Sequence, residues 1–417
     1  MKNLVKKWTE SSLILKIVTG LALGTVLGLV FPKASFIGIP GTVFIGALKA
    51  IAPVLVALLV CSAIAGSGSG IGERFKTVIV LYLLSTLIAA LVATASSSIF
   101  RIELTLPAAA AAEAPGGLKE IFESLFTRIV QNPVSSIAEG NYLGILFWAV
   151  VIGLALKLVA SESTLKTLSD LSDAVSRVVT WIIQFAPIGI LGIMYTNIAG
   201  NGLDIFATYG QLILLLVGTM LVVAVIINPF LVFLAIRRNP YPLVLRALKE
   251  SGIPAFFTRS SAANIPVNMD FCERLGLDKD FYSVSVPLGA TVNMNGAAVT
   301  ITVMSLTAAH TIGVDIPLVI EATLSIVAAI AACGASGVAG GSLLLIPMAC
   351  SMMGISNDVA MEVVAVGFII GVIQDSVETA VNSSGDVIFT ATSEYYSRKK
   401  AGKPMNYVTD HEKRQIY

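Results

Sequence analysis

Charged side chains are scarce in this chain. Of its 417 residues, 13% are Asp, Glu, Lys or Arg and 56% are hydrophobic, and the mean hydropathy is +0.86. Several apolar runs reach the roughly 18 residues that a bilayer-spanning helix needs. The charges, which sum to +1, lie between these runs rather than on one basic face. The composition predicts an all-α integral membrane protein with no large soluble domain and no nucleic-acid partner.

Cysteine and histidine are also few, with four and two copies. The cysteines fall in apolar segments without CxxC or Cys/His ligand spacing, and we interpret them as small core residues in preference to a disulfide or a metal site. They are Cys61, Cys272, Cys333 and Cys350. His310 lies at the end of a predicted span and His411 in the tail, so neither indicates a catalytic base.

Six long apolar segments precede residue 240 and predict six spans. They lie at residues 13–31, 43–65, 77–99, 142–160, 176–199 and 210–236. The first follows the basic start MKNLVKKW, but it is too long for a signal sequence and lacks a small-residue cleavage site, so we expect it to remain a span. Lys and Arg cluster near residues 2–7, 74–76, 157–177, 237–249 and 398–403. The positive-inside rule then places both termini in the cytoplasm, which requires an even number of crossings.

The pattern changes after residue 240, where four apolar segments are interrupted. Segment 253–269 breaks at a Ser/Ala/Asn tip, and a second one (317–355) breaks at a Gly/Ser cluster. Each half is too short to span, which predicts two re-entrant hairpins, 248–272 and 317–355, whose tips meet inside the protein. Each hairpin precedes a polar-interrupted span, 283–309 and 361–392, and we expect both spans to be broken. A hairpin plus a broken span, occurring twice, is typical of inverted repeats in a secondary transporter, although Gly and Pro are common in any membrane helix.

The last span carries the stretch GVIQDSVETAVNSSGD, residues 371–386. On a helix, Asp375, Thr379, Asn382 and Asp386 fall within roughly 60° of one another, and Glu378 lies roughly 60° to the other side of Asp375. A carboxylate at the bilayer centre costs roughly 2.5–3.5 kcal/mol, so we expect these carboxylates to have interaction partners or a function. We prefer a substrate and ion pathway to the alternative, an ion-pair network that only holds helices together.

The seventh span supplies a second polar element. In TVNMNGAAVT, an unwound turn at Asn293, Asn295 and Gly296 would direct carbonyl oxygens inward, and Gly296 tolerates backbone angles that other residues avoid. Hard monovalent cations prefer oxygen ligands, and transporters supply them from unwound helix segments. The sequence therefore predicts a cation site here, with Asp386 neutralising one bound cation.

Four motifs in order behind six spans resemble the dicarboxylate/amino acid:cation symporter family, the glutamate-transporter homologues. They are TRSSAANIP, PLGATVNMNGA, GASGVAGG and DSVETAVNSSGD. The resemblance implies a single membrane transporter domain (1–417), eight transmembrane helices, two re-entrant hairpins and a homotrimer surrounded by lipid. It also implies an elevator mechanism, in which a transport part (77–99 and 210–392) slides against a scaffold (13–65 and 142–199).

The resemblance assigns site residues by position. The substrate site is assigned to Ser260, Ser261, Ala297, Val338, Gly340, Asp375, Glu378, Thr379 and Asn382. One sodium position is assigned to Gly289, Asn293, Asn382 and Asp386, and a second to backbone atoms near Thr291, Met294, Ala332 and Ala335. A third is assigned to Tyr82, Ser85, Thr86 and Asn295. No organic cofactor is implied.

Two departures from the family pattern indicate the substrate. Members that carry acidic substrates have an arginine where this chain has Glu378, and a threonine where it has Ala297. A carboxylate at Glu378 would repel an acidic substrate, so the pocket suits a small neutral amino acid. We expect Arg259, the nearest cation, to pair with Glu378 or Asp375 rather than with the ligand. At the third sodium position the family's aspartate is replaced by Asn295, which puts the full sodium count in question.

Three hypotheses about function follow. The first is sodium-coupled uptake of small neutral amino acids, above all serine and threonine, across the inner membrane of a bacterium. The alternative keeps the fold but moves glutamate, aspartate or dicarboxylates. An intramembrane aspartic enzyme is excluded, because Asp375 and Asp386 lie about 16 Å apart along one helix and cannot share a proton. The amphipathic segment 118–130 is interpreted as an external surface connector.

Overall fold

The computed structural model describes residues 13–66, 73–106, 130–203, 205–333, 335, 340–405 and 407. Within these ranges every regular element is helical, as the composition predicts. The segment 118–130, apart from its last residue, and Val338 lie outside the described residues.

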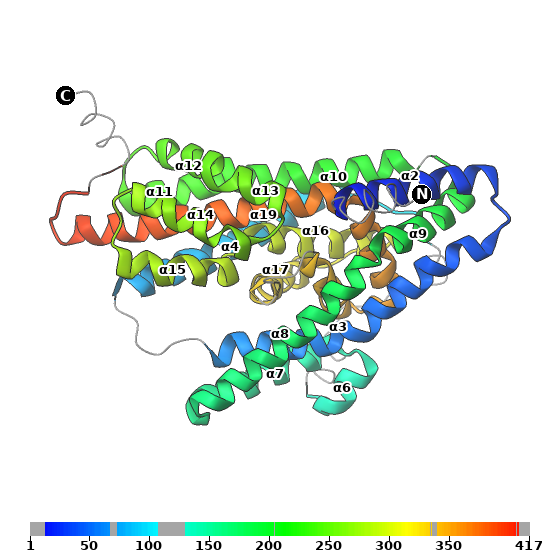
Figure 1. The fold of residues 1–417 in the computed structure, drawn as a ribbon, viewed down its shortest axis with the longest axis horizontal. Helices are drawn as coiled ribbons and strands as arrows, with labels where there is room; N and C mark the ends of the chain where they lie inside the picture. The colour runs from blue at the N-terminus through cyan, green and yellow to red at the C-terminus, as the bar shows by residue number, and fades with distance from the viewer. Residues whose placement is uncertain are drawn as a thin grey trace, which may run out of the picture.

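The helices fall into two groups by their contacts. The first group is α2 (Leu13–Val30), the 3-10 turn η1 (Ser35–Gly38), α3 (Ile39–Ala65), α6 (Pro133–Glu139), α7 (Tyr142–Val159), α8 (Glu162–Gln184) and α9 (Ala186–Asn201). The second begins with α4 (Glu73–Ile99), α10 (Ile205–Val222), the π-turn η3 (Val223–Ile227) and α11 (Asn228–Ile236). In Figure 1, α3, α6, α7 and α8 form the lower part of the molecule, and α4, α10 and α11 lie above them.

The second group continues with the segments predicted as hairpins and broken spans. The first hairpin comprises α12 (Tyr241–Ala247), the π-turn η4 (Leu248–Gly252), α13 (Ile253–Thr258) and α14 (Ser261–Arg274). It is followed by α15 (Lys279–Val292) and α16 (Asn295–Thr311). The second hairpin comprises α17 (Leu318–Ala332), the 3-10 turn η5 (Gly341–Leu345) and α18 (Ile346–Met352), and it leads into α19 (Asn357–Lys400).

Length and hydropathy agree with most of the predicted spans. Among the described residues, five helical stretches are long and apolar enough to cross a membrane, and a sixth candidate is the pair α8 and α9, bent by 55°. The bend follows from Pro187 at the start of α9, and the sequence pattern did not reveal it. Helices α2 and α7, with 18 residues each, occupy the two other predicted positions but are shorter.

Close backbone contact joins α2 to α9 in the first group. Gly20, Gly24 and Gly28 recur every four residues and therefore lie on one face of α2. A Cβ atom added to Gly20 would lie 2.1 Å from the Pro187 carbonyl oxygen, and one added to Gly24 would lie 2.4 Å from the Leu191 carbonyl oxygen. Only glycine permits this approach, so the backbones of α2 and α9 pack directly against each other.

The two predicted breaks have different outcomes. The break in the seventh span is confirmed, since α15 ends at Val292, α16 begins at Asn295, and Asn293 and Met294 have non-helical dihedral angles. The break predicted in the last span is wrong, because α19 is one continuous helix of 44 residues. Some of its hydroxyl side chains bond within the helix, as Thr379 Oγ1 does to the Asp375 carbonyl, whereas others, such as Ser383 and Thr390, bond to neighbouring helices. The helix contains no proline, so every backbone N–H of the stripe can still donate within α19.

The helix α19 is the axis of the second group. It contacts α4, α10, α11 and α13 to α16, and Figure 1 shows it running among them. The second hairpin also contacts the first group, η5 against α3 and α18 against α7. The polar stripe of α19 is therefore enclosed by helices rather than exposed to lipid.

Candidate functional site

The polar stripe of α19 is buried along its whole length. Asp375, Glu378, Thr379 and Asn382 are 4–6% exposed, and Asp386 is 0% exposed. The α15–α16 break lies beside the C-terminal part of this stripe, where Gly296 N–H donates a hydrogen bond to Asn382 Oδ1 at 2.7 Å. Two residues that are 86 positions apart in the sequence thus meet through this hydrogen bond.

Asp386 lies at the centre of the first predicted sodium position. Its Oδ1 accepts a hydrogen bond of 3.0 Å from Asn293 Nδ2, which also donates to the Asn382 carbonyl at 3.0 Å. A Cβ atom on Gly289 would lie 2.9 Å from Oδ1, so glycine is required for this approach. Asp386 Oδ2 is buried without a hydrogen-bond partner. An unpartnered buried carboxylate oxygen among carbonyl and amide oxygens fits a cation such as Na⁺.

The four residues of the second sodium position are less closely joined. Met294, Ala332 and Ala335 are buried, whereas the Thr291 side chain is exposed and donates to its own helix at the Leu288 carbonyl. The thiol of Cys333 contacts the Val292 carbonyl at 3.5 Å, which brings the second hairpin to the end of α15. Among the described residues, no hydrogen bond connects the four assigned residues across the two elements.

The four residues of the third position converge. Asn295 Oδ1 accepts hydrogen bonds of 3.0 Å from the hydroxyls of Ser85 and Thr86, and both hydroxyls also lie within 2.9 Å of the Tyr82 carbonyl. Asn295 Nδ2 donates to Asn228 Oδ1 at 3.2 Å. Asn228 directly follows the π-turn of the sixth span, and sequence reasoning missed it. The pattern Asn-Pro at 228–229 inside an apolar run was the available signal.

Asp375 joins both hairpin tips. Its Oδ2 accepts a hydrogen bond from Arg259 Nε at 2.7 Å and forms an ion pair with Nη2 at 2.6 Å, and its Oδ1 accepts a hydrogen bond from the Gly340 N–H at 3.4 Å. The predicted pairing of Arg259 with an acid of α19 is confirmed, and the acid is Asp375. Gly340 has φ +71°, in the left-handed region that glycine occupies readily.

Glu378 has a separate set of partners. Its Oε2 accepts hydrogen bonds from Thr300 Oγ1 at 2.7 Å, Ser342 Oγ at 2.8 Å and Gln374 Nε2 at 2.5 Å. All three donors are neutral, and they come from α16, the second hairpin and α19. Sequence reasoning did not assign these residues, although Gln374 lies one helical turn before Glu378 and Ser342 is the last residue of the Gly/Ser cluster. Among the described residues, no hydrogen bond to Oε1 is found.

The other predicted substrate residues lie around these two acids. Ser260 begins α14, where its Oγ accepts a hydrogen bond from Ala263 N–H, and Ser261 is half-buried in the first turn. Ala297 is fully buried on α16, close to Gly296, whose missing side chain allows contact with the Glu378 backbone. The described members of the predicted substrate set therefore come from both hairpins, α16 and α19.

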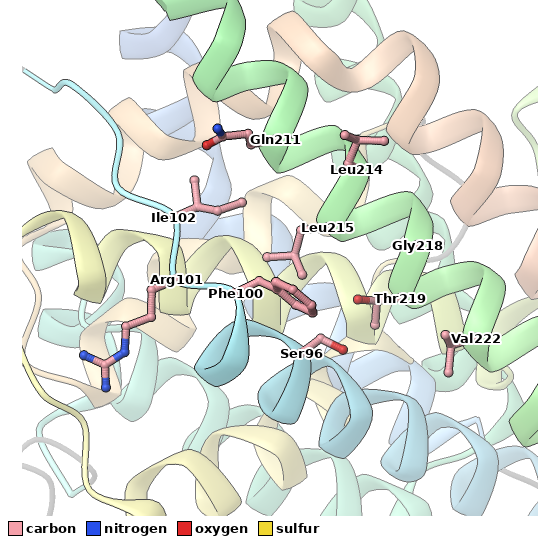
Figure 2. A pocket seen from close by; sticks show the side chains of 10 residues that line it. All are labelled: Ser96, Phe100, Arg101, Ile102, Gln211, Leu214, Leu215, Gly218, Thr219 and Val222. Carbon is pink, nitrogen blue, oxygen red and sulfur yellow. The ribbon is translucent and has the colours of Figure 1, made fainter.

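A large cavity lies elsewhere in the described part of the chain. It has a volume of about 540 Å³ and lies between the end of α4 and α10, as Figure 2 shows. Its lining is mainly apolar, its charged side chain Arg101 pairs with Asp315 at 3.1 Å, and Leu214 on its rim is 73% exposed. It contains none of the predicted site residues, and no carboxylate among its lining residues could hold an amino group as Asp375 can.

Comparison with known proteins agrees with this geometry. The model of the sodium:dicarboxylate symporter family matches residues 13–395, and the chain belongs to this family. It is a multi-pass membrane protein.

Three relatives bear the name serine/threonine transporter SstT. The one from Bifidobacterium adolescentis is 57% identical over 95% of this chain and 93% of its own length. That of Streptococcus agalactiae serotype Ia is 56% identical over 94% and 98%, and that of Streptococcus thermophilus is 53% identical over 96% and 100%.

Proposed function

We propose that this protein is a symporter that couples the entry of Na⁺ to the uptake of serine and threonine. Relatives that are 53–57% identical over nearly the whole chain are named for these two substrates. The structural observation that carries the proposal is the buried carboxylate of Glu378. The family resemblance places an arginine at this position in members that carry acidic substrates.

The surroundings of Glu378 suit a hydroxyl side chain. Three neutral donors hold Oε2, and Oε1 remains available among the described residues. A carboxylate oxygen accepts a hydrogen bond from the hydroxyl of serine or threonine, whereas the carboxylate of aspartate or glutamate would face like charge without a counter-ion. This argues against the acidic-substrate alternative. Asp375 is the group that would hold the substrate's ammonium.

Sodium is the second substrate in this proposal. Asp386, with its unpartnered Oδ2, carries the negative charge that a sodium ion would neutralise, and the carbonyl oxygens at the α15–α16 break complete an oxygen-rich environment. The second position, near Met294 and the second hairpin, and the third, around Asn295, are proposed as further cation positions. Each would link cation binding to the same helices that hold the amino acid.

The arrangement of the helices suggests how sodium and the amino acid would cross the membrane together. We propose eight spans and two re-entrant hairpins, with both termini in the cytoplasm and a homotrimer in the inner membrane. Residues 13–65 and 142–199 would form the scaffold, and residues 77–99 and 210–392 the moving transport part. The contact groups around α2, α3 and α9 on one side and α19 on the other support this division.

The test is uptake into proteoliposomes that contain the purified protein. Labelled serine and labelled glutamate are offered with an inward sodium gradient, and again with potassium in place of sodium. We expect serine to accumulate only with sodium and glutamate to remain outside. Accumulation of glutamate, or equal serine uptake without sodium, would contradict the proposal.

A further inference from the structure

Arg259 is already paired with the Asp375 carboxylate, which is the group that the substrate's ammonium would bind. The proposed partner of the substrate's ammonium is Asp375, yet two guanidinium nitrogens of Arg259 already lie 2.6 and 2.7 Å from its Oδ2. Both side chains are largely buried, with exposed fractions of 13% and 6%. A buried pair of this kind is costly to break by removing one partner, because the other charge is left without compensation.

On the side of the first group of helices, the crevice beside the pair is too small for an amino acid. The crevice between Asp375, Arg259, Gly340 and the first group of helices has a volume of about 20 Å³, which is enough for one water molecule. The residues that close it on the first-group side are Ile17, Ile183 and Ala186. From this side, a substrate can reach Asp375 only if the surrounding side chains, Arg259 among them, move away.

The backbone of Arg259 is held in a conformation that side chains other than glycine rarely adopt. Its φ is +53°, and its N–H closes the last turn of α13 on the Ala255 carbonyl at 2.8 Å. Such a residue is strained and persists where surrounding contacts determine it. The position at the hairpin tip aims the guanidinium across to α19, so the tip is built around this ion pair.

We propose that the substrate inserts as a zwitterion into the Arg259–Asp375 ion pair. The ammonium takes the place of the guanidinium on Asp375, and the substrate's carboxylate pairs with the displaced Arg259. One internal ion pair is replaced by two charge-assisted pairs of about 2.8 Å each, and the net charge of the site does not change. On release the internal pair re-forms, so that neither Asp375 nor Arg259 is left buried and unpaired in the empty protein.

This inference rests on the proposed function and adds a requirement to it. The ligand must carry both charges, because a ligand with one of them opens the pair and leaves one protein charge uncompensated. Serinamide has the ammonium without the carboxylate, and glycerate has the carboxylate without the ammonium. Both retain the hydroxyl group that Glu378 would accept, so they isolate the two charges.

The experiment measures binding to the purified full-length protein in saturating sodium. Labelled serine is displaced by unlabelled serine, serinamide or glycerate, at a pH at which the amine of serinamide is protonated. We expect both analogues to bind the wild type at least about tenfold more weakly than serine. In Arg259→Asn, which keeps a residue tolerant of the left-handed conformation, serine should weaken about tenfold or more while serinamide changes little.

Arg237 provides the matched control. It also ends a helix in the left-handed conformation, with φ +57° and its N–H bonded to the Phe233 carbonyl at 2.8 Å, but it follows α11 rather than contacting Asp375. Arg237→Asn should keep the wild-type ratio of serine to serinamide affinity. The reciprocal variant Asp375→Asn should lose discrimination against glycerate.

The ratio of affinities decides the outcome. An unchanged ratio of serine to serinamide affinity in Arg259→Asn overturns the proposal, and so does tighter serine binding with that ratio unchanged, since Arg259 would then only compete for Asp375. If Arg259→Asn does not fold, Arg259→Lys keeps the charge and loses the fork geometry, and serine should then weaken more than serinamide. Failure of the wild type to bind serine at all would instead contradict the proposed function.

Discussion

The Nδ2 atom of Asn293 lies 3.0 Å from Oδ1 of Asp386 and 3.0 Å from the Asn382 carbonyl oxygen. A single amide therefore ties the broken seventh span to α19 and orients the carboxylate. The other oxygen of Asp386 is left without a partner at full burial. An arrangement that satisfies one oxygen and leaves the second free favours a cation ligand over a purely structural acid.

Replacing Asp386 by Asn should uncouple serine from sodium. The amide keeps the size of the side chain but removes the charge, so the sodium concentration for half-maximal serine binding should rise by about tenfold or more. Serine binding at fixed sodium should weaken through the same linkage. The measurement is a sodium titration of labelled serine binding. Asp173→Asn on the exposed face of α8 is the control, and an unchanged sodium midpoint in Asp386→Asn would remove this residue from the site.

Replacing Glu378 should change the charge of the accepted substrate. Glu378→Arg together with Ala297→Thr should weaken serine uptake and permit some aspartate uptake, because the new cation can pair with a side-chain carboxylate. Glu378→Gln alone should be milder, since an amide oxygen still accepts hydrogen bonds from Thr300 and Ser342. Uptake of both labelled amino acids is compared after sodium binding has shown that each variant is folded. A folded double variant that carries serine and ignores aspartate would refute this role of Glu378.

A methyl group in the α2–α9 contact should destabilise the protein. Gly24→Ala places a Cβ 2.4 Å from the Leu191 carbonyl oxygen, and overpacking of this kind costs about 1–3 kcal/mol. Gly210→Ala on α10 is the control, because its Cβ would have no atom within 4 Å and alanine favours a helix. Thermal unfolding in one detergent should give a lower midpoint for Gly24→Ala and an equal or higher one for Gly210→Ala. Equal midpoints for both variants would show that the α2–α9 contact is adjustable.

The ion pair of Arg74 and Asp278 should make stability depend on pH in the acid range. The hydrogen bond from Arg74 at 2.7 Å lowers the pKa of Asp278 from its ordinary value of 3.8. A lowered pKa adds stability above the ordinary value, and that stability is lost as the pH falls through the folded-state pKa. The pair is partly exposed, with side-chain exposures of 41% and 39%, so the effect should be about 1 kcal/mol or less.

Asp278→Asn tests this dependence, because it keeps a side-chain oxygen for the Asp280 N–H at the start of α15. The midpoint difference between wild type and variant should be largest near neutral pH, begin to shrink near pH 3.8 and disappear below the lowered folded-state pKa of Asp278. Asp280→Asn, whose side chain is exposed, is the control. A difference that persists in acid would mean that the pair contributes nothing through its charge.

The amino-acid sequence determined that the protein lies in a membrane, where its helices run and which charged groups they carry. Apolar runs of membrane length gave the spans, because backbone groups in lipid must be bonded within the helix. Spacing along one helix placed Asp375, Thr379, Asn382 and Asp386 on a common stripe, and the turn at Asn293 and Met294 was visible as a polar interruption. Each of these features is a property of a single segment, so it can be predicted from the sequence without knowing which other helix the segment contacts.

Only the tertiary structure decided which charges meet. Arg259 had two candidate acids, and contact with Asp375 left Glu378 to Thr300, Ser342 and Gln374, which lie on three different elements. Asn228 joined Asn295 across two spans, and α19 stayed continuous where its polarity indicated a break. Periodicity gives the direction of a side chain on its own helix but not the neighbour that satisfies it. A buried polar group is stable only with such a partner, so the packing of the helices fixed the chemistry of the site.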